Sequence, residues 1–222
     1  MLLLECNIKI KGEIILAKQK NKKGKKVLLI LIGIAAVVAL VITGLNYSAV
    51  QTLIKQGNSY EKLTIENQLV PEKDKNGYPT FVTDKQLKVL QLTDVHIGGG
   101  FMSSKKDSMA MNSVAAMITA EKPDLVVVTG DVSYPVPFQA GTFNNLSSAR
   151  IFAQLMESLG VYWTLGYGNH DTEAYSYYGR EDLSALYSDE KYSYCIFEAG
   201  PEAVDGYGNQ IINIKNSDGI IT

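Results

Sequence analysis

One uninterrupted run of 19 uncharged residues, Val27–Leu45, constrains this chain more than any other feature of its sequence. An α-helix rises ~1.5 Å per residue, so a run of this length reaches across the ~30 Å hydrocarbon layer of a bilayer. The run is apolar on every helical face and a lysine cluster precedes it, which favours a membrane span over a buried core helix. We therefore expect residues 27–45 to form a single transmembrane helix in the lipid bilayer.

The charges on either side of this run indicate its orientation. Residues 1–26 carry eight lysines and two glutamates, a balance of +6, which leaves −8 for the rest of a chain whose net charge is −2. Basic segments stay on the cytoplasmic side, so we expect a basic cytoplasmic N-terminus at 1–26 and a single-pass cell-membrane protein with an extracellular domain.

A cleaved signal peptide is the alternative to an anchor. Its apolar region is usually only ~7–15 residues long. The best candidate cleavage site, Tyr47-Ser48-Ala49, has a bulky tyrosine where a small residue is preferred. With an uncleaved anchor, Cys6 and Cys195 lie on opposite sides of the membrane and form no disulfide framework.

A regular pattern of strands and helices begins at Leu87, after residues 46–86, which mix short apolar stretches with turn formers and are expected to be a spacer. The expected strands are 87–92, 125–129 and 161–165, and the expected helices are 106–121 and 147–159. This alternation predicts an α/β fold around a mainly parallel sheet. Further along we expect a helix at 181–187, strands at 192–197 and 210–215, and a hairpin turn at 216–219.

Polar side chains follow the ends of the three expected parallel strands. Asp94 and His96 follow the first strand, Asp131 the second, and Asn169 and His170 the third. Because the carboxyl ends of parallel strands meet at one edge of a sheet, we expect these side chains to converge. Oxygen donors and neutral imidazoles are the ligands of a hydrolytic metal site.

The three motifs at these strand ends together resemble the first three signatures of the calcineurin-like metallophosphoesterases. They are Leu92-Thr93-Asp94-Val95-His96, Thr129-Gly130-Asp131 and Gly168-Asn169-His170-Asp171. The stretch Trp163-Thr164-Leu165-Gly166-Tyr167 is similar to the branch of phosphohydrolases related to purple acid phosphatases. For residues 87–222 the resemblance implies the N-terminal half of a four-layer α/β/β/α sandwich, truncated at its C-terminus.

The resemblance also implies a two-metal centre. Asp94 and His96 would bind the first divalent ion, Asp131 would bridge the two ions, and Asn169 would bind the second through its amide oxygen. The ions would be manganese, iron, zinc or similar, and a hydroxide bridging them would attack the phosphorus of a phosphoester.

The third motif also implies the catalytic residues of a metal-dependent phosphatase. His170 would stabilise the transition state or protonate the leaving oxygen, and Asp171 would orient its ring. Tyr134 falls in a Gly-Asp-x-x-Tyr element similar to that in which purple acid phosphatases bind ferric iron. Since the first motif here supplies His96, which those enzymes lack, we expect Tyr134 to pack or to line the cleft.

Each of these residues also has a plain structural explanation, because an aspartate after a strand is commonly a loop residue and Asn169 fits a left-handed turn. The three motifs in order outweigh those explanations. The chain lacks the later lone histidine and the Gly-His-x-His element of the family, however, and His96 and His170 are its only histidines. We therefore expect the second metal site to be the weaker one and the isolated chain to be weakly active or inactive.

A non-catalytic alternative stays open, in which the membrane-tethered domain is a pseudoenzyme or an interaction module. Nucleic-acid binding is not expected, because the exported part is acidic and its lysines are scattered.

Overall fold

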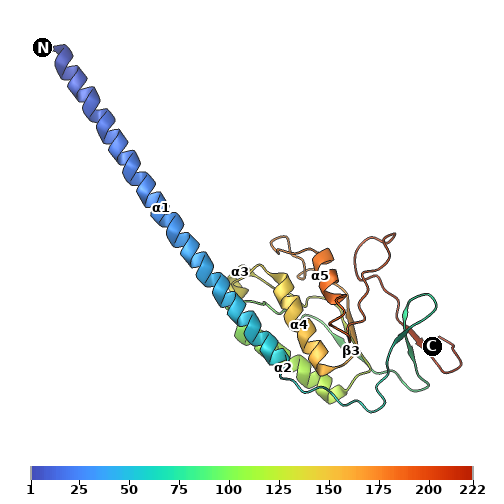
Figure 1. Ribbon diagram of the computed structural model, residues 1–222. Coiled ribbons are helices and arrows are strands. Elements are labelled where there is room, and N and C mark those ends of the chain that lie inside the picture. The colour runs from blue at the N-terminus through green and yellow to red at the C-terminus, as the bar shows by residue number, and fades with distance from the viewer. Residues whose placement is uncertain (1, 222) are drawn as a thin grey trace. The chain divides into compact units, whose positions relative to one another are not determined.

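The computed structural model describes residues 2–221, with side chains from residue 23 onward (Figure 1). The chain separates into two compact units, residues 1–44 and 45–222. The first unit belongs to helix α1 (Leu2–Gly57). The part of α1 from Lys23 to Gly57 is long and apolar enough to cross a membrane, and its most apolar stretch is fully exposed. A helix of this kind near an N-terminus is either a membrane span or a signal sequence.

The second unit begins inside α1, because residues 45–57 of that helix pack into the domain. Val50 and Leu53, one helical turn apart, are both buried in the hydrophobic core. We expected residues 46–86 only to lead into the domain, and the structure shows that they also supply part of its core. The apolar spacing of Val50 and Leu53 was too short a pattern to be distinguished from the end of the preceding run.

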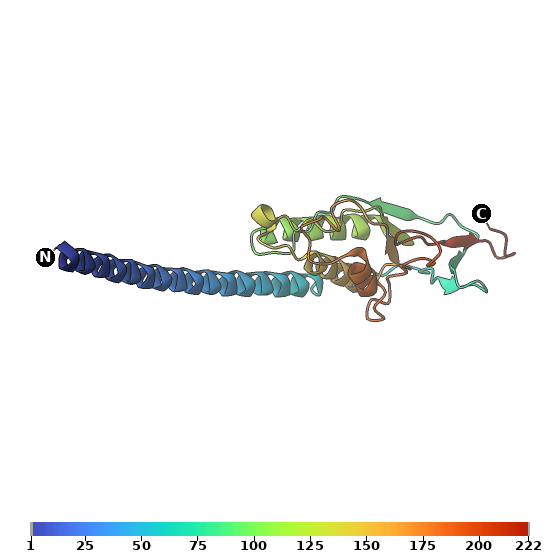
Figure 2. The same ribbon diagram turned by 90° about the horizontal axis from the view of Figure 1, so that it is seen from above.

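The central sheet is parallel and confirms a mixed α/β domain. Strand β4 (Leu125–Val128) lies between β3 (Val89–Leu92) and β5 (Trp163–Leu165). Helix α2 (Ser104–Glu121) connects β3 to β4, and α4 (Asn145–Leu159) connects β4 to β5. Figure 2 shows α2 and α4 as neighbouring helices.

One face of this sheet forms the core with the helices. Alternate residues of each strand point to this face, and they are Leu90, Leu92, Val126, Val128, Trp163 and Leu165. Residues between them on β3, such as Val89 and Gln91, are exposed. The sheet therefore has one packed face and, along β3, one open face.

The remaining elements are short. Helix α3 (Pro137–Ala140) follows β4, α5 (Arg180–Tyr187) follows β5, and a small second sheet combines β1 (Glu72–Lys73), β2 (Pro79–Val82) and β6 (Asn213–Lys215). The small sheet lies at the C-terminal end of the unit in both views (Figures 1 and 2). The expected turn at 216–219 is present. The N–H of Asn216 donates to the carbonyl of Ile220, and the N–H of Gly219 donates to the carbonyl of Asn216.

The strand predicted for residues 192–197 is wrong. The N–H of Cys195 donates to the carbonyl of Tyr192, which folds the chain into a turn and leaves a single bridge between Cys195 and Trp163. Tyr192 and Phe197 are nevertheless buried in the core. Their hydrophobic pattern reflects burial in a loop rather than pairing in a sheet.

Replacing Leu53 by alanine tests whether α1 belongs to the domain. The cavity should cost ~2–5 kcal/mol of unfolding free energy, measured in detergent micelles by the fluorescence of Trp163, which is buried. Leu40→Ala, at an exposed position of the apolar run, is the matched control and should leave that free energy unchanged. Equal effects of the two substitutions would contradict the packing described.

Candidate metal centre

The loops that leave β3 and β4 run side by side at the carboxyl edge of the sheet. The N–H of Asp94 donates to the carbonyl of Gly130 over 3.2 Å, and the N–H of His96 donates to the carbonyl of Asp131 over 3.0 Å. The N–H of Ile97 continues the pairing to Val132 at 2.8 Å. The parallel arrangement of the strands thus extends past their ends and brings the first two motifs into register.

The third loop, which follows β5, closes against the second. The N–H of His170 donates to Oδ1 of Asp131 over 2.8 Å. Gly130 has φ 107° and lies so close to Gly168 that a Cβ built on it would be 2.6 Å from the Gly168 nitrogen. Any side chain at Gly130 would push the two loops apart.

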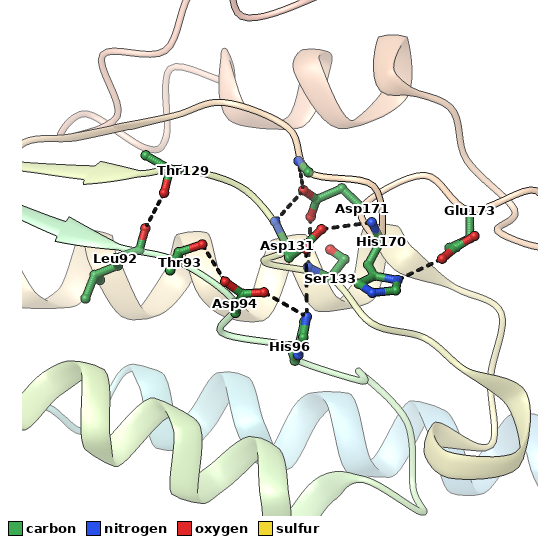
Figure 3. A network of polar contacts seen from close by, with 11 residues as sticks. Leu92, Thr93, Asp94, His96, Thr129, Asp131, Ser133, His170, Asp171 and Glu173 are labelled. Carbon is green, nitrogen blue, oxygen red and sulfur yellow. Dashed lines mark hydrogen bonds and ion pairs between the residues drawn. The ribbon is translucent and has the colours of Figure 1, made fainter.

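Three of the predicted residues meet in one cluster. A ligand atom from each of His96, Asp131 and His170 lies within 4.8 Å of the others. Nε2 of His96 lies 3.7 Å from Oδ1 of Asp94 and 4.0 Å from Oδ2 of Asp131, as Figure 3 shows. These separations are too long for hydrogen bonds, and Nε2 of His96 is buried with no hydrogen-bond partner among the described residues.

The backbone at this cluster is in an uncommon conformation. Asp94, His96 and Asp131 have φ of 55°, 54° and 56°, in the left-handed region. A left-handed conformation costs ~1–2 kcal/mol for a residue with a Cβ, although aspartate and histidine tolerate it better than most. Strain of this kind persists only where the surrounding structure fixes it, and it is concentrated at functional sites.

Asp171 holds two of the loops together. Its buried carboxylate accepts backbone N–H bonds from Asp131, Ser133 and Gly168, each 2.9 Å long. Burial raises the pKa of this carboxyl, and the three hydrogen bonds oppose that rise. Both carboxylate oxygens are occupied by backbone donors.

The expected pairing of Asp171 with the His170 ring is therefore wrong. Nδ1 of His170 lies 2.7 Å from Oε1 of Glu173, which takes the place expected for Asp171 (Figure 3). This contact directs the ring of His170, and Asp171 supports the backbone behind it.

A second buried carboxylate supports the loop that follows His96. Asp107, in the first turn of α2, accepts the N–H groups of Gly98 and Gly99 at 2.9 and 3.0 Å and the hydroxyl of Ser103 at 2.8 Å. Burial raises the pKa of Asp107 as well, against these bonds. The loops at the site are thus tied to rigid elements on both sides.

Tyr134 packs against both histidine rings. Its ring centre lies 4.8 Å from that of His96 and 4.7 Å from that of His170. The two imidazoles are 5.3 Å apart, nearly perpendicular to each other. Tyr134 fixes the position of both rings, which agrees with the packing role expected from the sequence.

Asn169 stands apart from this packing. It lies between Gly168 and His170 in the third loop, and its side chain is exposed. Of the four expected metal ligands, Asp94 and Asp131 each have a carboxylate oxygen within 4.0 Å of Nε2 of His96, and Asn169 is exposed.

The region that contains this cluster matches a known protein family. Residues 87–220, more than half of the chain, match the family described as calcineurin-like phosphoesterase. The chain belongs to the calcineurin-like phosphoesterase family. Its three strand-end motifs all lie within the matched region.

One relative of the chain is a protein of Arabidopsis thaliana named "Probable inactive purple acid phosphatase 14". It is 32% identical over 105 residues, which cover 42% of this chain and 25% of the relative. The match therefore spans about a quarter of the relative's length. No solved structure matches the chain.

Two residues that support the candidate centre were not identified from the sequence. Glu173 follows His170 by three positions, a spacing that puts both side chains on one side of a turn, and this was its only signal. Asp107 occupies the first turn of a helix, where acidic residues are common for reasons unrelated to any site. Its role depends on contacts with a separate loop, which no local pattern records.

Two substitutions of Asp94 separate the metal binding of its carboxylate from the strain of its left-handed backbone. The Asp94 side chain is 56% exposed, so its carboxylate contributes little to stability. Asp94→Gly and Asp94→Ala should both weaken Mn²⁺ binding, measured by calorimetry. Asp94→Gly should be the more stable of the two by roughly 1 kcal/mol, because glycine relieves the left-handed backbone. An alanine variant at least as stable as the glycine variant would contradict the strain described.

Proposed function

We propose that this protein is a metal-dependent phosphoesterase whose metal centre is built on Asp94, His96 and Asp131. The observation that carries the proposal is the buried Nε2 atom of His96, which has no hydrogen-bond partner among the described residues and lies between two carboxylates. A buried polar atom of this kind costs free energy unless something binds it.

The dimensions at His96 suit a cation. Metal–ligand bonds to imidazole nitrogen and carboxylate oxygen are each ~2.0–2.2 Å long. Two ligands of one ion are therefore roughly 3–4 Å apart, depending on the angle between them. The observed separations of 3.7 and 4.0 Å agree with this spacing. The left-handed backbone of all three residues supports the same proposal, since strain of this kind is concentrated at functional sites.

The other residues have tasks that follow from their contacts. Asp131 keeps one oxygen on the His170 N–H and leaves the other free to bridge two ions. His170, held by Glu173, is placed to stabilise the phosphoryl group or to donate a proton to the leaving oxygen. Divalent ions, when bound, supply Lewis acidity toward the phosphoryl oxygens and an activated water as nucleophile.

The second ion has fewer ligands in this chain than the first. Asp131 and Asn169 would hold it, and Asn169 is exposed at the rim. We infer that the second site binds more weakly, and that hydrolysis by this chain alone is slow. In the four-layer sandwich that we propose, a second sheet covers the exposed face at Val89 and Gln91.

We further propose that residues 27–45 anchor the protein in the cell membrane. The exposed apolar side chains of this part of α1 support a membrane span. The lysines of residues 1–26 keep that segment in the cytoplasm, so residues 87–222 act on phosphoesters outside the cell.

A second candidate function is a membrane-tethered pseudoenzyme that binds metal without turnover. The name of the Arabidopsis relative, "probable inactive", and the small number of ligands for the second ion favour this alternative. The two functions share the first metal site and differ only in hydrolysis.

Metal titration of the purified chain with two matched histidine variants tests the proposal. His96→Ala should weaken Mn²⁺ binding by at least ~100-fold, beyond the 10–100-fold loss typical of an outer-shell partner. His170→Ala should keep the affinity and lose the slow, chelator-sensitive hydrolysis of an aryl phosphate.

Unchanged Mn²⁺ binding in His96→Ala would refute the metal site. Normal binding with no hydrolysis by the wild-type chain, even at high enzyme concentration, would instead select the pseudoenzyme.

A further inference from the structure

Three large apolar or aromatic side chains of the second unit are exposed, one in α1, one in the turn before α2 and one in α3. Phe138 is 91% exposed, Tyr47 is 68% exposed and Met102 is 53% exposed. Lys105 and Lys106 follow Met102 and are exposed in the first turn of α2. We propose that these five residues form a membrane-contacting surface that rests on the lipid bilayer.

Contacts of Asn46 bring the members of this membrane-contacting surface together. Nδ2 of Asn46 donates to the carbonyl of Gly141 over 2.9 Å, and Oδ1 of Asn46 accepts the N–H of Phe101 over 2.9 Å. The N–H of Met102 donates in turn to the carbonyl of Ala140 over 3.2 Å. Tyr47, the loop at Met102 and the end of α3 therefore occupy one region of the second unit.

The position of Asn46 in the chain identifies the bilayer as the occupant. Leu45 is the last residue of the apolar run, and Asn46 is the first residue after it. The proposal rests on the membrane anchor proposed above, because a chain anchored through residues 27–45 leaves the bilayer at this point. A surface fixed by Asn46 then lies at the level of the lipid headgroups.

Contacts near the end of α1 show in which direction its residues 45–57 run within the second unit. Nε2 of Gln56 donates to the carbonyl of Ser108 and to Oδ1 of Asn112, one to two turns into α2. The segment 45–57 therefore runs from the loops of the membrane-contacting surface toward the middle of α2.

The chemistry of the surface suits a bilayer better than a protein partner. Aromatic and aliphatic side chains enter the interfacial layer, and nearby lysines are attracted to anionic headgroups. Neither Lys105 nor Lys106 makes an ion pair within the described residues, and the adjacent Asp107 is buried beneath its own hydrogen bonds. This gives a local basic patch on a domain whose overall charge is acidic.

The membrane-contacting surface adjoins the candidate metal centre through the chain itself. The loop that carries Met102 begins at His96, and α3, which carries Phe138, begins three residues after Tyr134.

Depth-dependent fluorescence quenching tests the surface with the full chain in vesicles. The vesicles contain phosphatidylcholine and phosphatidylglycerol with brominated acyl chains, which quench tryptophan on contact. In these vesicles a larger fraction of the tryptophan fluorescence should be quenched in Phe138→Trp than in the wild type. The single tryptophan of the wild type, Trp163, is buried. Met117→Trp is the matched control, and it should show no added quenching. Met117 is an exposed apolar residue of α2, and the helical rise puts it about 18 Å along the helix from Lys105.

A third variant separates this inference from the anchor on which it rests. Val37→Trp lies in the apolar run and should be quenched whenever the chain spans the bilayer. Quenching at residue 37 with none at residue 138 would overturn the surface and leave the anchor standing. No quenching at residue 37 would overturn both. Shielding of residue 138 that depends on protein concentration would assign the surface to a second copy of the chain and overturn the bilayer contact.

Reversing the charge of Lys105 and Lys106 tests whether these lysines contact anionic lipid headgroups. Lys105→Glu combined with Lys106→Glu should reduce the quenching of Phe138→Trp in anionic vesicles and have a smaller effect in vesicles of phosphatidylcholine alone. Equal effects in the two kinds of vesicle would show that the lysines do not contact the headgroups.

Discussion

The carboxylate of Asp171 is the interaction on which the candidate centre depends. It binds backbone N–H groups from both the second and the third loop, so it sets the distance between Asp131 and His170. A buried donor that loses its acceptor costs ~1–3 kcal/mol, and three donors depend on this one side chain. Asp107 does the same for the loop that follows His96. The site is therefore an arrangement of backbone fixed by two buried acids.

That fixed backbone explains how strained residues can be held at the sheet edge. The left-handed conformations of Asp94, His96 and Asp131 are individually unfavourable, yet the pairing of their loops leaves no freedom to relax. Their side chains then face each other without direct hydrogen bonds. Folding supplies the free energy that keeps the ligands in place before any ion arrives.

The sequence predicted the part of the fold that depends on local periodicity. The strands β3, β4 and β5 and the helices α2 and α4 were expected close to their observed bounds, since each has a clear apolar pattern. The strand expected at 192–197 failed because Tyr192 and Phe197 are buried in a turn, and periodicity does not distinguish that from a strand. The continuation of α1 into the core was hidden by the apolar run before it.

At the site, too, local sequence patterns predicted some features, and others depended on contacts between distant segments. That Asp94, His96, Asp131 and His170 would meet could be predicted from parallel strands ending at one edge. The tasks of Asp171 and Glu173 could not, because both depend on which atoms of distant loops are left without partners after folding. Asp171 was expected beside the His170 ring because the family resemblance implied it, and the structure gives that contact to Glu173.

A crystal structure of the chain grown with Mn²⁺, from data recorded on both sides of the manganese absorption edge, decides whether Asp94, His96 and Asp131 bind a metal ion. The account predicts an anomalous peak bound by Nε2 of His96 and by carboxylate oxygens of Asp94 and Asp131, with at most a weaker second peak beside Asn169. Full occupancy by manganese elsewhere on the chain, with Nε2 of His96 still unbound, would contradict it.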